Sequence, residues 1–459
     1  MNLFHIAWRN MQQRGLATVL TMFSMALGVG LVVLVLSLSW IITESFDRNS
    51  NVGYNLIVGA KGGSLQLALN TVFYLSKPIE VIPYEEYLEL IPGRGGRQAE
   101  IEKIGGLVAE PERNGLFCDY TNGGFAIPVC LGDFLGPFRV VGTTPAFFEK
   151  LRYGRAADSE YTFSEGRNFV DYSPENGYYE AVIGAQVANY MKLKVGDSFK
   201  TTHGDPDGEG HGQAFEVVGV LAPTGTPNDR AAFINLEGFY LMEGHTRVFE
   251  DGANPEDEKE AVGAEAEAGQ PPRLPLEKRD LTAVLVKAGS PIYAVHMQRP
   301  IDKRLRTQAV SPVSEITNML TTFVNPIRYA FLALTVVVCV VSAISILVSI
   351  YNSMNERRRD IAIMRALGAR RDAVVMVILL ESLLIAVGGG LAGWIFGHAI
   401  GVACSGLVES MTGISIGFFN TITIQEAVLI PGLMILATLA GIVPAFVAYR
   451  TNVSENLGN

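Results

Sequence analysis

The stretch Asn355–Gly397 reads NERRRDIAIMRALGARRDAVVMVILLESLLIAVGGGLAGWIFG and joins a dense cluster of positive charge to a long apolar run. A second long uncharged segment precedes it. Arginine beside an apolar span stays on the cytoplasmic side of a membrane. The stretch therefore predicts a membrane protein with a cytoplasmic loop, whose arginines are Arg357, Arg358, Arg359, Arg365, Arg370 and Arg371.

Four segments of the chain are long, apolar and almost free of charged residues, in a sequence whose hydrophobic content is 49%. Each exceeds the roughly 20 residues that a helix needs to cross the hydrocarbon of a bilayer. The first is also longer than the apolar part of a secretion signal. We expect four transmembrane helices, at 15–43, 329–354, 373–406 and 427–449.

Flanking charges predict the orientation of these spans. Arg9 and Arg14 precede the first span and Arg450 follows the fourth, whereas the connection between the third and fourth spans has neither Lys nor Arg. Both termini are therefore expected in the cytoplasm. The other pieces are then an amphipathic N-terminal helix at 1–14, an outer domain at 44–328, a cytoplasmic loop at 355–372, a short outer loop at 407–426 and a cytoplasmic tail at 450–459.

The chain carries a net charge of −10 although its cytoplasmic pieces are rich in arginine. The acidity therefore belongs to the outer domain, and we expect no nucleic-acid partner, since such proteins carry basic surfaces. The most acidic part, 249–278, is poor in large apolar residues and punctuated by proline. It is predicted to be a mobile surface insertion because it cannot bury enough apolar surface to order itself.

Short β-branched runs bounded by Gly, Pro or polar residues predict strands in the outer domain. Segments with helical spacing alternate with them, so we expect an α+β domain. The predicted strands are 55–60, 180–184, 214–222, 231–236 and 282–288, and the predicted helices are PYEEYLELI (83–91), TPAFFEKLR (144–152), AQVANYMKLK (185–194) and PIYAVHMQRPIDKRL (291–305).

Two of the four cysteines fall in the outer domain. Cys118 and Cys130 bracket the glycine-rich segment DYTNGGFAIPV in an oxidising compartment, where a disulfide can persist. A disulfide that closes this loop and a pair of free thiols are both open at this point. Cys339 and Cys404 lie inside spans and are interpreted as small apolar residues.

A polar loop, THGDPDGEGHG at 202–212, is the weak candidate for a metal site. Carboxylate and imidazole groups recur along it and could gather around one divalent ion. The alternative is a solvated hairpin turn, in which these residues favour turn geometry. No established metal-binding spacing is present, so we expect no metal; the candidate ligands are His203, Asp205, Asp207, Glu209 and His211.

The third span carries two unusual features. Glu381 lies about 13 Å along the helix from Asp372 at 1.5 Å per residue, which places it near or inside the cytoplasmic leaflet. A carboxylate there needs a partner, such as an arginine of the cluster, unless the helix projects into water. A strict four-residue repeat predicts a face for close helix packing, formed by Gly389, Gly393, Gly397 and Gly401.

An apolar stripe lies within the arginine cluster. Ile361, Met364 and Leu367 recur at helical spacing, and Gly368 follows as a stop. Such a short helix can insert its apolar side into a cleft on a partner, while arginine binds carboxylates there. It can also serve as an orientation anchor that binds anionic lipid, and the two roles are compatible.

These segments, in this order, resemble the MacB/LolC/FtsX superfamily of ABC transporter permeases, also called type VII or mechanotransmission transporters. The match includes Asn355–Gly397, together with VVGTTPAFFEKL, SEGRNF, YEAVIGAQVANYMKLKVGDSF and FEVVGVLAPTGTPNDRAAFINL of the outer domain. The latter group is similar to the MacB-like periplasmic core domain. Only the acidic insertion and 61–82, KGGSLQLALNTVFYLSKPIEVI, lie outside the resemblance.

The resemblance implies a subunit of the bacterial inner membrane that forms a homodimer or heterodimer and binds two copies of an ABC ATPase. It implies a coupling helix at the apolar stripe, with Arg357, Arg358, Arg359, Asp360, Ile361, Met364, Arg365, Leu367 and Gly368 as the ATPase-coupling residues.

No Gly-Lys pair occurs in the sequence, so the phosphate-binding loop of ATPases is missing. We therefore expect no cofactor and no catalytic residue in this chain, with ATP and Mg²⁺ bound by the partner ATPase. The expected function is conformational work in the periplasm, such as extrusion or extraction of a periplasmic or membrane-borne ligand. The alternative is an FtsX-like regulatory scaffold that acts on a periplasmic protein partner without transport.

Overall fold

The computed structural model describes residues 3–13, 15–50, 52–75, 78, 80–154, 156–204, 210–242, 273–356 and 370–405, with single positions from 426 to 446. The chain divides into two compact units. One is a sheet domain, Ser45–Leu320, and the other is a helical unit made of Met1–Glu44 and Thr321–Asn459.

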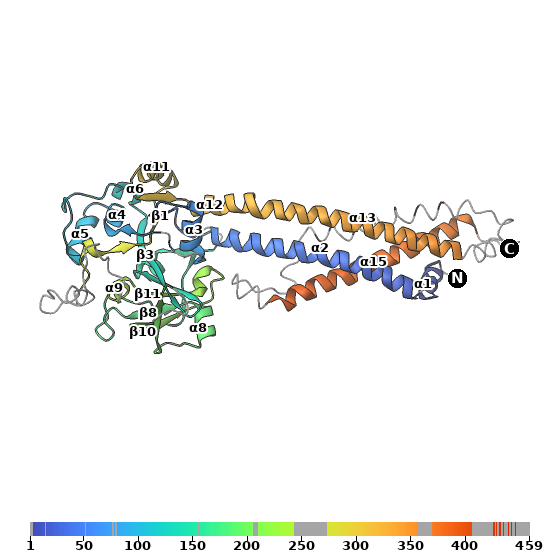
Figure 1. The fold of residues 1–459 in the computed structure, drawn as a ribbon, viewed down its shortest axis with the longest axis horizontal. Coiled ribbons are helices and arrows are strands. Elements are labelled where there is room, and N and C mark those ends of the chain that lie inside the picture. The colour runs from blue at the N-terminus through green and yellow to red at the C-terminus, as the bar shows by residue number, and fades with distance from the viewer. Residues whose placement is uncertain are drawn as a thin grey trace. The chain divides into compact units, whose positions relative to one another are not determined.

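The sheet domain is built on one ten-stranded mixed sheet, in which β1, β3, β11, β8 and β10 follow one another across Figure 1. The full order is β14-β1-β13-β3-β4-β11-β8-β10-β7, with β9 paired to β10 and β3. Pairs β4–β11 and β8–β10 are parallel and the others are antiparallel. The strands are β1 Leu56–Ala60, β3 Phe125–Leu135, β4 Phe138–Thr143, β7 Phe163–Gly166, β8 Glu180–Ile183, β9 Ser198–His203, β10 Gly210–Leu221, β11 Ala231–Asn235, β13 Ala283–Lys287 and β14 Thr307–Val310.

Both faces of the central strands are buried, which is why these strands are continuous apolar runs. Side chains alternate between the two faces of a strand. Phe233 of β11 therefore packs in one core cluster, and its neighbours Ala232 and Ile234 pack in the other. The pairing register places side chains of the same core cluster next to each other on neighbouring strands. Phe233 of β11, for example, lies beside Val141 of β4, and both belong to the same cluster.

Short helices and two small two-stranded sheets complete this unit. β2 (Ile82–Pro83) pairs with β12 (Asp280–Leu281), and β5 (Arg152–Tyr153) pairs with β6 (Ser159–Glu160). The helices are α3 Ser64–Phe73, α4 Tyr84–Leu88, α5 Gly96–Ile104, α6 Cys118–Thr121, α7 Ala146–Lys150, α8 Ala185–Met191, η1 Pro227–Arg230, α9 Leu236–Tyr240, η2 Leu276–Lys278, α11 Pro291–Asp302 and α12 Pro312–Met319.

The five strands and four helices predicted for the outer domain are all present, as β1, β8, β10, β11 and β13 and as α4, α7, α8 and α11. One long interior strand, β3, was not predicted. β3 contains Pro128 and Gly132, which are poor strand residues. Pro128 nevertheless lies opposite Val284 of β13, and its carbonyl accepts a hydrogen bond from Thr143 Oγ1. The segment between Cys118 and Cys130, predicted as a glycine-rich loop, is therefore partly helix α6 and partly strand β3.

The end of the predicted acidic insertion is ordered. Leu274 and Leu276 are buried in the core of the sheet domain, and η2 forms there. These two leucines pack this end of the predicted insertion into the core, so the sheet domain resumes before the predicted boundary at 278. The other part of the prediction, 249–272, lies outside the described residues.

The helical unit contains α1 (Leu3–Gln13), α2 (Gly15–Ser50), the π-helical turn η3 (Leu320–Val324), α13 (Asn325–Glu356) and α15 (Arg371–Ala403). Among the described residues, three helical segments are long and apolar enough to cross a membrane: Gly15–Trp40, Pro312–Val338 and Asp372–Ala403. The second begins before the predicted span at 329–354, which α13 covers in full. Most of the predicted fourth span, 427–449, lies outside the described residues, and its described positions are helical.

Candidate functional site

Helix α15 contacts α2 through the predicted glycine face. A Cβ atom added at Gly393 would lie 2.5 Å from the carbonyl oxygen of Ala26, and one added at Gly397 would lie 2.8 Å from that of Gly30. At Gly389 the corresponding distance to Met22 O is 3.0 Å. Real Cβ atoms do not approach so closely, so the two backbones meet only because these positions lack side chains.

Two details of this face were not evident in the sequence. Gly401 has no atom of the described residues within 4 Å of an added Cβ, so it stands apart from the other members of the repeat. On the opposing helix, a Cβ at Gly30 would lie 3.2 Å from Gly393 O, so the glycine contact is reciprocal. Gly30 belongs to no four-residue glycine repeat on α2, so the sequence pattern of that helix does not reveal its role.

Glu381 is buried inside the helical unit, with 7% of its surface exposed, and it interacts with a neighbouring residue. Its neighbour Ser382 is fully buried. The arginines predicted as its partners at 357–359 and 365 lie outside the described residues, so the pairing itself stays a prediction. The predicted coupling helix lies in the same undescribed part of the chain.

A buried polar cluster joins α15 to Glu426. Glu426 Oε2 accepts a hydrogen bond from Trp394 Nε1 at 3.1 Å and lies 2.9 Å from His398 Nε2. The His398 and Glu426 side chains are 1% and 2% exposed. Trp394 and His398 are four residues apart on one helix face, and their rings meet edge to face with centroids 4.9 Å apart.

Sequence reasoning missed this cluster. Glu426 was predicted as the last residue of the outer loop at 407–426, without a buried partner. The available signal was the spacing of Trp394 and His398, which places two hydrogen-bond donors on one face of an apolar helix. Inside an apolar unit such donors require an acceptor, and a carboxylate is the strongest one available.

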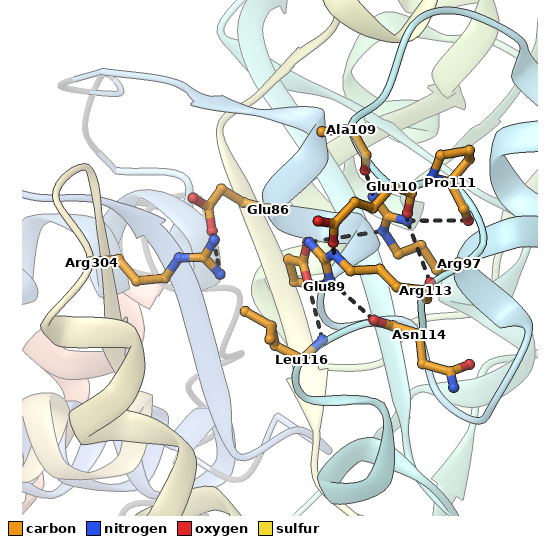
Figure 2. Close-up of polar contacts among 10 residues, drawn as sticks. All are labelled: Glu86, Glu89, Arg97, Ala109, Glu110, Pro111, Arg113, Asn114, Leu116 and Arg304. Atoms are coloured by element: carbon orange, nitrogen blue, oxygen red, sulfur yellow. Dashed lines mark hydrogen bonds and ion pairs between the residues drawn. The ribbon is translucent and has the colours of Figure 1, made fainter.

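The sheet domain contains an ion-pair network centred on Glu89, and Figure 2 shows Arg113 and Arg97 converging on it from the neighbouring loop and helix. Arg113 Nη1 donates to Glu89 Oε2 at 2.8 Å, its Nη2 contacts Oε1, and the Leu116 amide donates to Oε2 at 2.9 Å. The Glu89 side chain is 5% exposed. A separate ion pair joins Glu86 to Arg304 at 3.2 Å.

Arg97 organises the loop that supplies Arg113. Its side chain is 2% exposed, and its Nε atom lies 3.9 Å from Glu89 Oε1. Its terminal nitrogens donate to backbone carbonyls of the loop, at Ala109 (2.9 Å), Glu110 (2.6 Å), Pro111 (3.2 Å) and Arg113 (3.4 Å). One buried cation therefore closes the loop against α5, and this role is structural.

Cys118 and Cys130 are both free and buried. Cys130 Sγ lies on β3, 3.6 Å from Tyr240 OH and 3.5 Å from Asp280 O, whereas Cys118 lies on α6. The candidate disulfide is therefore not formed in the structure, because the β3 strand directs the Cys130 thiol into the core beside Tyr240. Burial raises the pKa of Cys130 to about 12, so this thiol stays protonated and unreactive at neutral pH.

The candidate metal loop places His203 next to a buried carboxylate. His203 Nδ1 lies 3.3 Å from Asp133 Oδ1, and Asp133 is fully buried. Asp205, Asp207 and Glu209 lie outside the described residues, and the His211 side chain is also not described. Within the described parts of the chain, no group of three or more His, Cys, Asp and Glu residues could hold a metal ion.

Comparisons with known proteins agree with this architecture. A family model described as a MacB-like periplasmic core domain matches residues 18–268, and one described as an FtsX-like permease C-terminal domain matches residues 332–453. The first match covers more than half of the chain. It runs from α2 through the strands as far as β11, and the second begins in α13 and includes α15.

Two relatives have similar sequences. A protein named as an uncharacterized ABC transporter permease of Methanocaldococcus jannaschii is 24% identical over 307 residues, which is 65% of this chain and 65% of the relative. The macrolide export ATP-binding/permease protein MacB of Bdellovibrio bacteriovorus is 25% identical over 291 residues, which is 60% of this chain and 37% of that protein. The matched part spans less than two thirds of either relative.

The sheet domain between two long apolar helices and the two domain matches lead to the same conclusion. The chain belongs to the MacB/FtsX-like family of ABC transporter permeases.

Proposed function

We propose that this chain is the membrane subunit of an ABC transporter that couples ATP hydrolysis on a separate ATPase to conformational work in the outer compartment. The observation that carries the proposal is the continuity of α2. Its apolar part ends at Trp40, yet the helix continues to Ser50, at the start of the sheet domain. These ten additional residues extend the helix by about 15 Å without a flexible linker.

An uninterrupted helix transmits displacement, because its backbone hydrogen bonds resist bending. The glycine contacts attach α2 to α15, and α15 begins at Arg371, directly after the predicted coupling segment. Movement imposed on that segment by an ATPase would therefore reach α2 through α15. We propose export or extraction of a periplasmic or membrane-borne ligand, because the described spans contain few ionisable residues that could line a path for polar solutes.

In this proposal two ATPase subunits bind a dimer of permease subunits from the cytoplasm, ATP and Mg²⁺ bind to the ATPase, and both termini of this chain are cytoplasmic. The membrane is the bacterial inner membrane. The docking residues are those of the apolar stripe and the arginine cluster, from Arg357 to Gly368. The absence of a Gly-Lys pair from this sequence supports ATP hydrolysis on another chain.

The double variant Met364→Asp with Leu367→Asp tests this proposal. Two carboxylates on the apolar stripe would carry a desolvation cost into any partner cleft, so we expect loss of the ATPase from the purified complex and loss of its ATP hydrolysis. Ala362→Asp with Ala366→Asp is the matched control, because it adds the same charge to the opposite helix face. Equal ATP hydrolysis in the stripe variant, the control and the parent chain would exclude docking through the stripe.

A further inference from the structure

The sheet domain contains a pocket between one face of its sheet and the C-terminal end of α3. Four aliphatic side chains from β3, β4 and β13 form its floor: Val129, Leu131, Val141 and Leu285. The end of α3, the start of η1 and the chain that leads into β1 form its walls. The floor of the pocket therefore belongs to the same core cluster as Phe233, so the pocket lies on that face of the sheet.

No charged side chain lines this pocket. Its lining is rich in aromatic rings: Phe147 is buried, whereas Tyr74, Tyr153 and Tyr161 are partly exposed and form its mouth. A buried carboxylate or ammonium group without an opposite charge is strongly disfavoured. The pocket therefore suits a neutral molecule whose body is apolar or aromatic.

Two hydroxyl groups at the pocket lack hydrogen-bond partners among the described residues. Thr71 Oγ1 is buried without a partner, and Thr71 as a whole is 5% exposed. Tyr54 is 7% exposed, and no hydrogen bond joins its hydroxyl to the described part of the chain. Burial and the neighbouring Tyr161 raise the pKa of Tyr54, so its hydroxyl stays protonated and can donate.

Three other polar side chains of the pocket are already paired with each other. Tyr74 OH donates to Asn228 Oδ1 at 2.7 Å, and Asn228 Nδ2 donates to Tyr161 OH at 2.6 Å. This arrangement fixes the two tyrosine rings at the mouth. Thr71 and Tyr54 are then the two buried donors that a bound molecule would satisfy, so the bound group must supply an acceptor oxygen.

The enclosed part of the pocket is small. Its cavity volume is about 30 Å³, which is room for roughly two water molecules. A group of that size that carries an acceptor oxygen is an acetyl or methyl ester group. A larger body attached to it would lie against the aromatic side chains of the open mouth.

We propose that this pocket binds a neutral molecule that inserts an acetyl-sized group with an acceptor oxygen toward Thr71 and Tyr54, and packs an apolar or aromatic body against the tyrosines of the mouth. Thr71, Val72 and Tyr74 belong to α3 and the residue that caps its C-terminal end, within the part of the chain that the MacB-like periplasmic core domain matches. The binding needs no ATPase, so it can be tested separately from the proposed function.

The test uses the full chain in detergent micelles and ligand-observed fluorine NMR with three probes of similar shape. 4-Fluoroacetophenone has the neutral acceptor, 1-ethyl-4-fluorobenzene lacks the acceptor, and 4-fluorobenzoate carries a charge. We expect line broadening from site-specific binding only with the ketone. Partition of the probes into micelles is common to all protein variants, so the signal is the difference between parent and variant chains.

Thr71→Val removes one donor at nearly constant volume, and we expect it to weaken ketone binding by roughly fivefold, as for loss of one hydrogen bond. Tyr54→Phe should act in the same direction. Both variants should fold, because each removes a polar group that is unpaired in the parent. The matched control is Thr317→Val, on the exposed surface of α12, which should bind like the parent.

Three results would overturn the proposal. The first is equal line broadening of the ketone with the parent and with Thr71→Val. The second is binding of the benzoate as strong as that of the ketone. The third is a crystal structure, grown with the ketone in the buffer, in which only ordered water lies at Thr71.

Discussion

Glu89 is the residue on which the ion-pair network of the sheet domain depends. Burial alone would raise its pKa, but hydrogen bonds from Arg113 and from the Leu116 amide outweigh burial and hold the pKa of Glu89 below its usual value of 4.5. A carboxyl group with a lowered folded-state pKa stabilises the fold above its unfolded pKa. That stability is lost as the pH falls from about 4.5 through the folded pKa.

The variant Glu89→Gln should therefore loosen the loop that contains Arg113 and Leu116. At pH 7 we expect local opening of 105–117 to become easier by about 2 kcal/mol, because removal of one partner leaves buried Arg97 with its charge less well compensated. Hydrogen exchange of the backbone amides in 105–117 measures this change. The difference between variant and parent should shrink as the pH falls through the lowered pKa of folded Glu89, because Glu89 is then protonated in the parent.

Glu110→Gln is the matched control for that measurement. Glu110 Oε2 also lies near Arg113, 3.4 Å from its Nε, but the Glu110 side chain is 78% exposed. Exposed ion pairs contribute at most about 1 kcal/mol, so exchange should stay close to that of the parent. If hydrogen exchange in 105–117 were as fast in the Glu110 variant as in the Glu89 variant, burial would not determine the strength of this network.

The cluster of Trp394, His398 and Glu426 shows the same principle inside the helical unit. Two donors on one helix converge on a single carboxylate oxygen at 3.1 and 2.9 Å. In an apolar unit an unsatisfied polar group is costly, so the three side chains hold their backbone segments together. The cluster thereby attaches the start of the predicted fourth span to α15.

At the scale of elements, the contact between α2 and α15 depends on backbone proximity. Three glycines of α15 face backbone or Cβ atoms of α2, and Gly30 of α2 faces α15 in return. Large apolar side chains are exposed elsewhere on the unit, for example Leu16 of α2 and Val336 of α13. Lipid tails are as apolar as these side chains, so close packing of small residues supplies the specificity of the helix contact.

Gly393→Ala should destabilise the helical unit although alanine favours helix. The added methyl group would lie 2.5 Å from Ala26 O, so the helices must separate, at a cost of about 2 kcal/mol. Gly401→Ala is the control, since no described atom lies within 4 Å of its added Cβ. There the helix propensity of alanine should leave stability unchanged or raise it by up to about 1 kcal/mol.

Thermal unfolding in detergent, followed by tryptophan fluorescence, measures both variants. All three tryptophans lie in the helical unit, at positions 8, 40 and 394, so the signal reports this unit alone. Equal midpoints for the two alanine variants would contradict the packing role of Gly393.

At the scale of the whole molecule, the two units share a continuous helix. α2 begins in the helical unit at Gly15 and ends at Ser50, and the sheet domain begins at Ser45. The chain re-enters the helical unit through α12, η3 and α13 without a described break. Helix continuity at both crossings favours mechanical coupling between the units, as the proposed function requires.

Thr43→Gly with Glu44→Gly tests this coupling where α2 leaves its apolar part. Each glycine weakens a helix by about 1 kcal/mol relative to alanine and permits other backbone conformations. In complex with its ATPase, the parent should show a change in hydrogen exchange of the sheet domain between ATP and ADP. We expect the glycine pair to abolish that change while ATP hydrolysis continues. Thr43→Ala with Glu44→Ala, which preserves the helix, should behave like the parent, and an unchanged response in the glycine pair would exclude transmission through α2.

Much of the fold was predictable because its signals are local. Short β-branched runs bounded by Gly, Pro or polar residues predicted five strands, and charge-free length predicted the apolar helices. β3 was missed because Pro128 and Gly132 are poor strand residues. The strand forms because it pairs with β13, which lies far along the chain, and with β4. The role of Glu426 was missed because its partner, His398, is 28 residues away and the two meet only in the folded helical unit.

By itself, the sequence determined that the chain carries long apolar helices typical of a membrane protein, that an α+β domain is inserted after the first of them, and that the third carries a small-residue face. These features follow from hydropathy, length and periodicity, which are properties of consecutive residues. Tertiary structure alone decided which helix Gly393 contacts, that the Cys130 thiol faces Tyr240, and that Thr71 and Tyr54 border one pocket. Each of these depends on distances between residues remote in sequence, which only the packing of the sheet and the helices determines.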